Sequence, residues 1–342
     1  MEVFFKKYGL KLKHEFRIAR EKEIICNNLF LKINMDGLTG YGEAAPTEYY
    51  NEDIETIYKL AESISEISEP DLENPYPFFE GLKEIYPNFP SLRAALEMAV
   101  YDIIGKFKKK PVHELFGLNP SHTPVTSFTI GIDKPDIIKM KLKEAEEYPV
   151  LKIKMGSEYD YEIIKILKNI KDKKIRIDAN EGWSREEAVK KMESLKEIGV
   201  EFVEQPLKKE DIEGIKWLKD RVDLKIFSDE NVKILQDINN IKDIYDGINI
   251  KLMKCGGLSE AVKMIITAKS YNLEVMLGCM IESSAAITAA AHISPCVDFA
   301  DLDGNLLISN DPFTGVSVKD GKLILPEKSG LGVEENIKNF SF

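Results

Sequence analysis

The chain has 342 residues, of which 44% are hydrophobic, and a formal net charge of −11 at pH 7. This length is typical of a globular enzyme of one or two domains, and the acidic balance argues against nucleic acid or an anionic membrane as the main partner. No apolar run approaches the length of a membrane span, and the start, MEVFFKKYGLKLKHEF, lacks the apolar core of a signal peptide. The cysteines form no CxxC motif, which suits reduced thiols. We therefore expect a cytoplasmic protein.

Residues 1–120 are expected to form an α+β domain. LFLKINMDGLTGYGEA (29–44) is typical of a hairpin with an Asp-Gly pair at its turn. Amphipathic helices are predicted near 52–67 and in SLRAALEMAVYDIIGKF (91–107). This arrangement differs from the rest of the chain, so we predict a separate capping domain.

Short apolar segments alternate with helix-period segments over most of the remaining chain. The predicted strands are VTSFTIGI (125–132), VLKIKM (150–155), KIRIDAN (174–180), VEFVEQP (200–206), LKIFSDE (224–230), GINIKLM (247–253), LEVMLGC (273–279) and VDFADLD (297–303). Eight such units predict an α/β fold, a closed parallel (β/α)₈ TIM-like barrel over residues 121–311. An open doubly wound sheet is the alternative, but it would more readily carry a Gly-rich turn after its first strand, and FTIGID has a single glycine.

Two of the predicted barrel helices carry recognisable end signals. In SREEAVKKMESLKEIG, Ser184 and Glu187 form a capping box. In SEAVKMIITAKSYN, we expect Ser259 and Asn272 to cap the two ends.

The C-terminal segment, residues 312–342, contains a second hairpin-like stretch. GVSVKDGKLIL places Asp320 and Gly321 at its turn. We expect this segment to return and pack on the capping domain.

One predicted strand, within LKIKMG, contains two lysines. Lys152 and Lys154 are two residues apart, so they point to the same face, where two ammonium groups repel and burial is costly. Taken alone, this alternation is compatible with a half-solvated edge.

Carboxylates end three consecutive predicted strands at the same point of the repeat. They are Asp178, Glu204 and Asp229. The carboxyl ends of barrel strands form the active site, and clustered carboxylates repel unless a cation joins them. Oxygen ligands without His or Cys select Mg²⁺ or Mn²⁺ over zinc. Helix N-caps and surface acids are the alternative interpretation.

A lysine on the sixth predicted strand suggests a catalytic role for the lysines of the second strand. Strands two and six are diametrically opposed in an eight-strand barrel, so Lys154 and Lys251 should face each other across a metal-bound substrate. A base on each side of one carbon suits removal of a proton from one face and its return to the other. Lys152 and the metal should lower the lysine pKa toward the working pH, as a general base requires.

The ordered motifs KIKMG, RIDANEGW, FVEQPL, FSDE, INIKLMKCGGL and DLDG resemble the muconate-lactonising-enzyme subgroup of the enolase superfamily. GYGEAAP and ALEMAVYDIIGK are similar to its capping domain, so the resemblance covers essentially the whole chain. It implies the same metal ligands and acid/base lysines, and it assigns Lys152 to the substrate carboxylate. The implied chemistry is proton abstraction α to a carboxylate, with Mg²⁺ stabilising the enediolate.

Within this subgroup, Asp301 and Asp303 of DLDG resemble the DxD motif of dipeptide epimerases. Strand eight lies opposite strand four, so a substrate carboxylate on the metal would send its amino end toward these acids. Two carboxylates suit an ammonium group, which muconate and succinylbenzoate lack. The expected function is a Mg²⁺-dependent dipeptide epimerase, an isomerase that inverts the α-carbon of the C-terminal residue of an L,L-dipeptide. Two acids that merely cap a turn are the alternative.

The resemblance also implies substrate contacts at Thr129, Cys279 and Ile281. Cys279 is expected to be a packed small residue rather than a nucleophile, because no His accompanies it. Asn180 is either a residue that tunes the metal site or an ordinary turn asparagine.

Several questions stay open at this point. The o-succinylbenzoate synthases, N-acyl amino acid racemases and muconate cycloisomerases share the lysine pair, and a non-catalytic metal-binding barrel is a rival of another class. In HEFRIARE, the segment that corresponds to the family's specificity loop, Arg17 or Arg20 could meet an acidic substrate side chain, whereas Glu21 would favour a cationic one. A homo-oligomer is compatible with the sequence.

Overall fold

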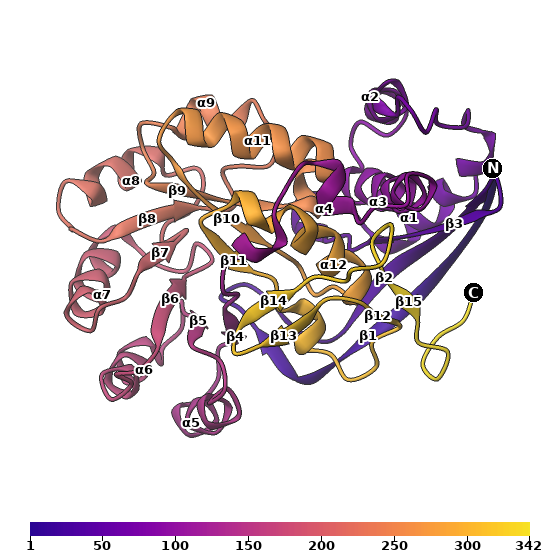
Figure 1. Cartoon of the computed structure of the whole chain (residues 1–342). Helices are drawn as coiled ribbons and strands as arrows, with labels where there is room; N and C mark the ends of the chain where they lie inside the picture. The colour runs from indigo at the N-terminus through magenta and orange to yellow at the C-terminus, as the bar shows by residue number, and fades with distance from the viewer.

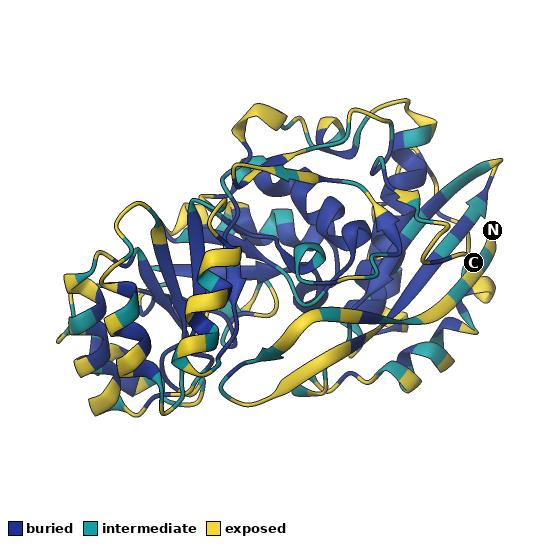
Figure 2. Ribbon diagram, turned by 90° about the horizontal axis from the view of Figure 1, so that it is seen from below, coloured by how far each residue is buried: buried dark blue, intermediate teal, exposed yellow.

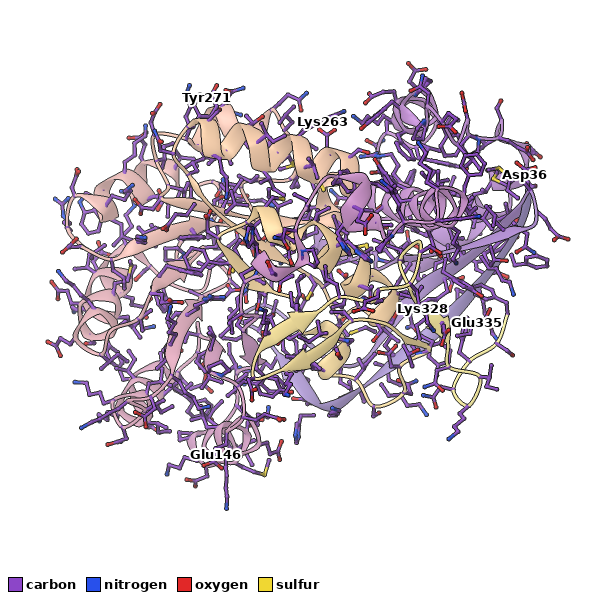
Figure 3. All side chains as sticks on the ribbon, viewed as in Figure 1. Asp36, Glu146, Lys263, Tyr271, Lys328 and Glu335 are labelled. Carbon is purple, nitrogen blue, oxygen red and sulfur yellow. The ribbon has the colours of Figure 1, made fainter.

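The structure is a computed structural model that describes residues 1–342. An antiparallel sheet with its helices lies beside a ring of parallel strands, and both chain ends lie on the side of the antiparallel sheet (Figure 1). The sheet has the order β1 (Glu2–Arg17), β2 (Lys22–Met35) and β3 (Leu38–Ala44). The predicted hairpin is confirmed: Asp36 and Gly37 take positive φ angles of 50° and 75° at its turn. Asp36 marks the end of this hairpin, far from the barrel (Figure 3).

Helix α3 (Pro90–Phe107) packs on β3, as expected for a helix that is buried along most of its length. Two glycines permit the close approach, because a Cβ at Gly42 would lie 1.9 Å from the carbonyl oxygen of Ala95 and one at Gly40 would lie 2.0 Å from that of Ala99. The predicted helix near 52–67 is shorter, with α1 at Ile54–Ala61 and a 3-10 turn at Ile64–Glu66. Helix α2 (Tyr76–Ile85) was not predicted, because prolines in NPYPFF resemble a loop although they are tolerated in a first helical turn.

The predicted (β/α)₈ barrel is confirmed. Its strands are β4 (Phe128–Ile130), β5 (Val150–Lys154), β6 (Lys174–Asp178), β7 (Phe202–Glu204), β8 (Lys225–Ser228), β9 (Gly247–Lys251), β10 (Glu274–Gly278) and β11 (Phe299–Asp301), all parallel and in chain order. A bridge between Thr126 and Ala300 joins the last strand to the first, and the Ser127 N–H donates to the Ala300 carbonyl at 3.1 Å. The closed ring leaves no free sheet edge for Lys152 to occupy.

Helices surround the barrel and expose their outer faces while the strands are buried (Figure 2). They are α5 (Pro135–Glu144), α6 (Asp160–Leu167), α7 (Arg185–Glu197), α8 (Ile212–Lys219), α9 (Asp237–Ile241), α11 (Leu258–Ser270) and α12 (Ser284–Ile293), with short helices α4 (Val112–Leu115) and α10 (Leu252–Cys255). The predicted capping box of α7 is confirmed, since the Ser184 N–H donates to Glu187 at 2.9 Å and the Glu187 N–H donates to Ser184 at 3.3 Å. None of the helices is both long and apolar enough to cross a membrane.

Two carboxylates of the N-terminal part cap barrel helices. The expected N-cap at Ser259 was wrong: α11 begins after Gly257, and the Ser259 N–H donates to Glu97 of α3. Asn272 does follow the helix end in a left-handed conformation, with φ of 60°. Glu43 of β3 accepts hydrogen bonds from the Ser283 N–H at 2.9 Å and from the Ser283 hydroxyl at 2.5 Å, where α12 begins. Both acids are buried, and each meets the positive end of a helix dipole.

The C-terminal segment contacts both parts of the molecule. Its predicted hairpin, β13 (Ser317–Lys319) and β14 (Lys322–Ile324), packs against the barrel rather than the antiparallel sheet, because the Thr126 N–H donates to the Gly321 carbonyl at 2.8 Å. By contrast, the rings of Phe313 and Phe340 lie 5.7 Å and 5.4 Å from that of Phe30 in β2. The short strands β12 (Phe313–Thr314) and β15 (Glu334–Glu335) pair beside them. The domain boundaries at 120 and 311 stay predictions.

The close packing of β3 on α3 predicts the effect of adding one methyl group. Gly42→Ala should lower the free energy of unfolding by roughly 1–3 kcal/mol, because the new Cβ would overlap the α3 backbone. Gly81→Ala, in α2 with nothing within 4 Å of its Cβ, is the matched control and should be neutral or stabilising by up to roughly 1 kcal/mol. Urea denaturation of both variants measures the difference. Equal stability of the two would contradict this account of the packing.

Candidate active site

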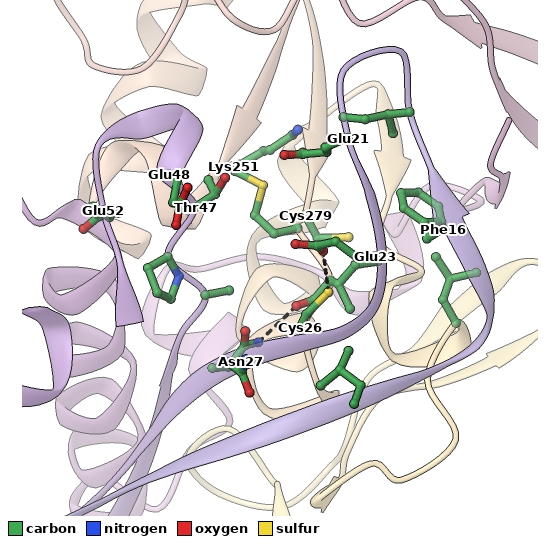
Figure 4. Close-up of a pocket in the computed structure, with 18 of the residues that line it drawn as sticks. Phe16, Glu21, Glu23, Cys26, Asn27, Thr47, Glu48, Glu52, Lys251 and Cys279 are labelled. Atoms are coloured by element: carbon green, nitrogen blue, oxygen red, sulfur yellow. Dashed lines mark hydrogen bonds between the residues drawn. The ribbon is translucent and has the colours of Figure 1, made fainter. Parts of the chain in front are cut away.

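A cavity of about 560 Å³ lies between the N-terminal part and the carboxyl ends of the barrel strands. Its size suits a small molecule. Figure 4 is a close-up of this cavity and shows segments of both parts around it. The sequence-predicted residues that line it are Arg20, Glu21, Thr129, Lys152, Lys154, Asn180, Lys251, Cys279, Ile281, Asp301 and Asp303. The predicted ligands Asp178, Glu204 and Asp229 lie behind this lining, fully buried.

Strand register explains why these groups meet. Lys154 is paired with Asp178 across β5 and β6, and Asp178 is paired with Glu204 across β6 and β7. On the other side of the ring, Lys251 and Asp301 are both in register with Gly278 of β10. Paired residues of parallel strands share one level and one face, so two rows of charge face each other across the barrel mouth.

Lys152 lies at the centre of a buried ion network. Its Nζ is 2.7 Å from Asp301 Oδ2, 2.7 Å from Glu204 Oε2 and 3.2 Å from Asp178 Oδ2, and its side chain is 1% exposed. Burial acts to lower the pKa of Lys152, but the three carboxylates outweigh it and hold the pKa well above its usual range. The half-solvated edge is therefore excluded, and the lysine pairs with acids from three other strands.

The two candidate acid/base lysines each contact a predicted metal ligand. Lys154 Nζ lies 2.6 Å from Asp178 Oδ2, and Lys251 Nζ lies 2.9 Å from Asp229 Oδ2. As the side chains stand, the pKa of Lys251 is raised, and the expected lowering by a bound metal stays a prediction. Burial lowers the pKa of Lys251, but Asp229 and, after it, Glu204 raise this pKa by a larger amount, so the net shift is upward. The expectation had assumed that a cation takes up the carboxylate charge.

Two further residues belong to this network and were missed by the sequence analysis. Lys254 Nζ donates to Asp229 Oδ1 at 2.5 Å and to the Asn249 carbonyl at 2.9 Å. The Asn249 side chain in turn donates to Glu204 Oε1 at 2.7 Å. Asn249 is two residues before Lys251, so strand alternation could have identified it as a residue of the same face. Lys254 is on a short helix, where strand alternation gives no signal.

The chemistry of the carboxylates fits a divalent cation. Burial, and after it Asp178, raises the pKa of Glu204 to about 7, and Lys152 offsets this rise only in part. Glu204 Oε2 and Asn180 Oδ1 are buried without a hydrogen bond, since the contact of Glu204 with Lys152 is an ion pair of poor hydrogen-bond angle. As the side chains stand, no three His, Cys, Asp or Glu residues converge on one point, because lysines lie between them. The donors are nevertheless all hard oxygens.

The two acids of DLDG differ in their partners. Asp301 accepts from the Ser127 hydroxyl at 2.6 Å as well as from Lys152, so its charge is matched. Asp303 accepts from the Thr129 N–H at 2.5 Å and has no ion pair. Burial, and after it the neighbouring Asp301, raises the pKa of Asp303 to about 7. Asp303 is therefore the acid of this pair whose charge is not already matched by a cation of the protein and can bind a cationic ligand group.

The loop after β10 completes the barrel side of the cavity. The Cys279 thiol donates to the Asp301 carbonyl at 3.3 Å, and burial raises its pKa well above the usual range, as expected for a packed residue rather than a nucleophile. The Ile281 carbonyl accepts from Asn28 of β2 at 3.0 Å, and the same amide donates to Glu43 at 2.8 Å. The N-terminal sheet therefore holds this loop directly.

The connection between β1 and β2 covers the cavity from the other side. Arg20 donates to Glu230 Oε1 at 2.8 Å, and its guanidinium lies 3.9 Å from the centre of the Tyr49 ring. Arg17 does not line the cavity, and its carbonyl accepts from the Ile132 N–H at 2.8 Å. Glu21 does line the cavity.

Comparison with known proteins identifies the family. A family model described as enolase C-terminal domain-like matches residues 138–338. The L-Ala-D/L-Glu epimerase of Bacteroides thetaiotaomicron is 41% identical over 97% of this chain and 88% of that protein. Among solved structures, the substrate-liganded L-Ala-D/L-Glu epimerase from Bacillus subtilis has a TM-score of 0.91 at 28% identity, covering 98% of each chain.

A second solved structure extends the same relationship. The dipeptide epimerase from Enterococcus faecalis, complexed with Mg and the dipeptide L-Leu-L-Tyr, has a TM-score of 0.90 at 32% identity and covers 97% of this chain and 99% of that one. The barrel, the antiparallel sheet and this similarity along nearly the whole chain agree with one another. The chain belongs to the enolase superfamily, in the group that includes these dipeptide epimerases.

Proposed function

We propose that the protein is a Mg²⁺-dependent dipeptide epimerase that inverts the α-carbon of the C-terminal residue of an L,L-dipeptide. The observation that carries this proposal is a pair of buried lysines, Lys154 and Lys251, on opposite sides of one cavity that also contains the acids Asp301 and Asp303. Relatives of this chain are named as epimerases of L-Ala-D/L-Glu and of hydrophobic dipeptides.

In this proposal, Asp178, Glu204 and Asp229 hold the Mg²⁺ ion. Their hard oxygens, and the buried Glu204 Oε2 that has no hydrogen bond, support the assignment. When bound, the cation supplies electrostatic stabilisation of the negative charge that develops on the substrate carboxylate as the α-proton leaves. Mn²⁺, which prefers similar ligands, is a possible substitute.

The lysines carry the proton transfer. One lysine in its neutral form removes the α-proton, and the other, as an ammonium, returns a proton to the opposite face of the same carbon. A cation on Asp229 and Glu204 would engage the carboxylates that raise the pKa of Lys251, which favours the neutral base. Lys152, which already contacts Glu204 and Asp301, would bind the substrate carboxylate.

The acid pair separates this function from the related activities. Asp301 and Asp303 would bind the free α-ammonium of a dipeptide, with Thr129, Cys279 and Ile281 lining the same wall. The o-succinylbenzoate synthase, N-acyl amino acid racemase and muconate cycloisomerase reactions use substrates without that ammonium group. A non-catalytic metal-binding barrel would not require two buried lysines on opposite sides of the cavity.

A cytoplasmic location is part of the proposal. The four cysteines are free, which suits a reducing compartment.

The metal assignment predicts a charge-specific loss of Mg²⁺ affinity. Glu204→Gln should weaken Mg²⁺ binding by more than roughly tenfold, because the neutral amide no longer opposes the cation. Glu201→Gln, at the opposite end of the same strand segment and paired with Arg176, is the matched control and should bind Mg²⁺ normally. Isothermal titration calorimetry of the apoprotein measures both. Wild-type affinity in the Glu204 variant would exclude this residue as a ligand.

The lysine assignment is tested by exchange of the α-proton in heavy water, followed by NMR. Lys251→Ala should stop epimerisation, a loss of at least roughly 100-fold, yet leave deuterium exchange from the one epimer whose proton faces Lys154. Lys154→Ala should show the reverse selectivity. Lys165→Ala, an exposed lysine of α6, is the control. If either active-site variant interconverted the epimers at nearly the wild-type rate, the two-base mechanism would be wrong.

The ammonium site predicts a pH dependence of KM. Asp303 binds an ammonium only as a carboxylate, and its pKa is raised to about 7, so KM for a free dipeptide should rise as the pH falls below about 7. Asp303→Asn should raise KM at high pH and abolish this dependence, while N-acetylated dipeptides should be poor substrates at every pH. A charge-assisted pair of this kind contributes roughly 1.5–3 kcal/mol.

Kinetics with free and N-acetylated dipeptides from pH 5 to 9 provide the measurement. Equal turnover of the two would point to an N-acyl amino acid racemase. Dehydration of the succinylbenzoate precursor, without dipeptide exchange, would move the assignment to the synthase.

A further inference from the structure

Neither Arg17, at the end of β1, nor Arg20, in the β1–β2 connection, is available to an acidic substrate side chain. Arg20 is the only cationic residue on the side of the cavity formed by the N-terminal part, and it is paired with Glu230, whose side chain is fully buried. Breaking that pair would leave a buried carboxylate without a partner, which is costly. Arg17 lies outside the cavity lining.

Glu21, the next residue of the connection, has the opposite character. It is exposed to the cavity and makes no hydrogen bond or ion pair through its side chain. Partial burial raises its pKa, and the charges of Arg20, Lys154 and Lys251 oppose that rise, so its carboxyl group lies within electrostatic reach of both lysines. Figure 4 shows Glu21 pointing from the loop toward the end of Lys251. A side chain on a carbon held between the lysines would extend toward this carboxylate.

The surrounding wall is also acidic. The acids that line this side of the cavity are Glu21, Glu23, Glu48, Glu52, Asp53 and Glu55. Four of them have partners within the N-terminal part: a thiol for Glu23, a serine for Glu52, a threonine for Asp53 and a lysine for Glu55. Glu48, like Glu21, has none through its side chain. The wall therefore presents uncompensated negative charge to the ligand.

We infer that, within the proposed epimerase function on which this inference depends, the preferred substrates are dipeptides whose inverted residue carries a cationic side chain, such as lysine or arginine, and that Glu21 is the residue that selects it. An ammonium or guanidinium group gains a charge-assisted partner at Glu21. An acidic side chain meets the negative wall and finds no free cation, so the same geometry disfavours it.

The test compares L-Ala-L-Lys, L-Ala-L-Glu and L-Ala-L-Leu by α-proton exchange in heavy water with saturating Mg²⁺. The wild-type protein should prefer L-Ala-L-Lys. Glu21→Gln should lower kcat/KM for L-Ala-L-Lys by roughly 10- to 100-fold, mainly through KM, and leave L-Ala-L-Leu within roughly twofold. Glu21→Arg should reverse the preference toward L-Ala-L-Glu.

Glu15→Gln is the matched control, because Glu15 is an acid of the same hairpin that pairs with Lys22 and lies outside the cavity lining. It should leave all three rates unchanged. Exchange that favours L-Ala-L-Glu, or a cationic preference that survives Glu21→Gln, would overturn the inference while the epimerase function stands. Absence of exchange in every dipeptide would overturn the proposed function itself.

Discussion

The balance of buried charge at the mouth of the barrel is the constraint on which the rest of the structure depends. An isolated ion in the protein interior is strongly unfavourable, and here several carboxylates and ammonium groups share one water-poor region. They are tolerated because each lysine contacts at least one acid from another strand, as Lys152 does with three. These contacts depend on strand register, because a shift of one residue would move the charged side chains of that strand to the outer face of the barrel.

The same constraint connects structure to chemistry. The pairing of Lys251 with Asp229 raises the pKa of this lysine, whereas a general base must give up its proton. In the proposed mechanism, this pairing has to be relieved before proton abstraction, so another group must first take up the charge of Asp229. A divalent cation and an anionic substrate that arrive together would redistribute the pairs, so binding itself would prepare the base.

Much of this could be predicted from the sequence. The barrel followed from eight repeats of one pattern, and the positions of Lys154, Asp178 and Lys251 followed from counting along strands. What could not be predicted depends on contacts between residues distant in the chain. Glu97 replaced Ser259 as the cap of α11 because a tertiary contact displaced the local signal. Likewise, only the fold shows that the Arg20 side chain is paired with Glu230 whereas the Glu21 side chain has no partner. In a loop, unlike a strand or a helix, the sequence has no periodicity that predicts where neighbouring side chains point.

The capping of α11 by Glu97 and of α12 by Glu43 has a consequence for how the molecule can be divided and how it can evolve. Without the antiparallel sheet, both barrel helices would lose the groups that satisfy their first N–H donors, and two acids would lose the partners that justify their burial. The two parts should then unfold as one cooperative unit and be poor candidates for domain exchange between relatives. Within the β1–β2 connection, Arg20 makes such a contact with the buried Glu230, whereas the Glu21 side chain makes none, so Glu21 is a position at which mutation can change substrate preference at little risk to folding.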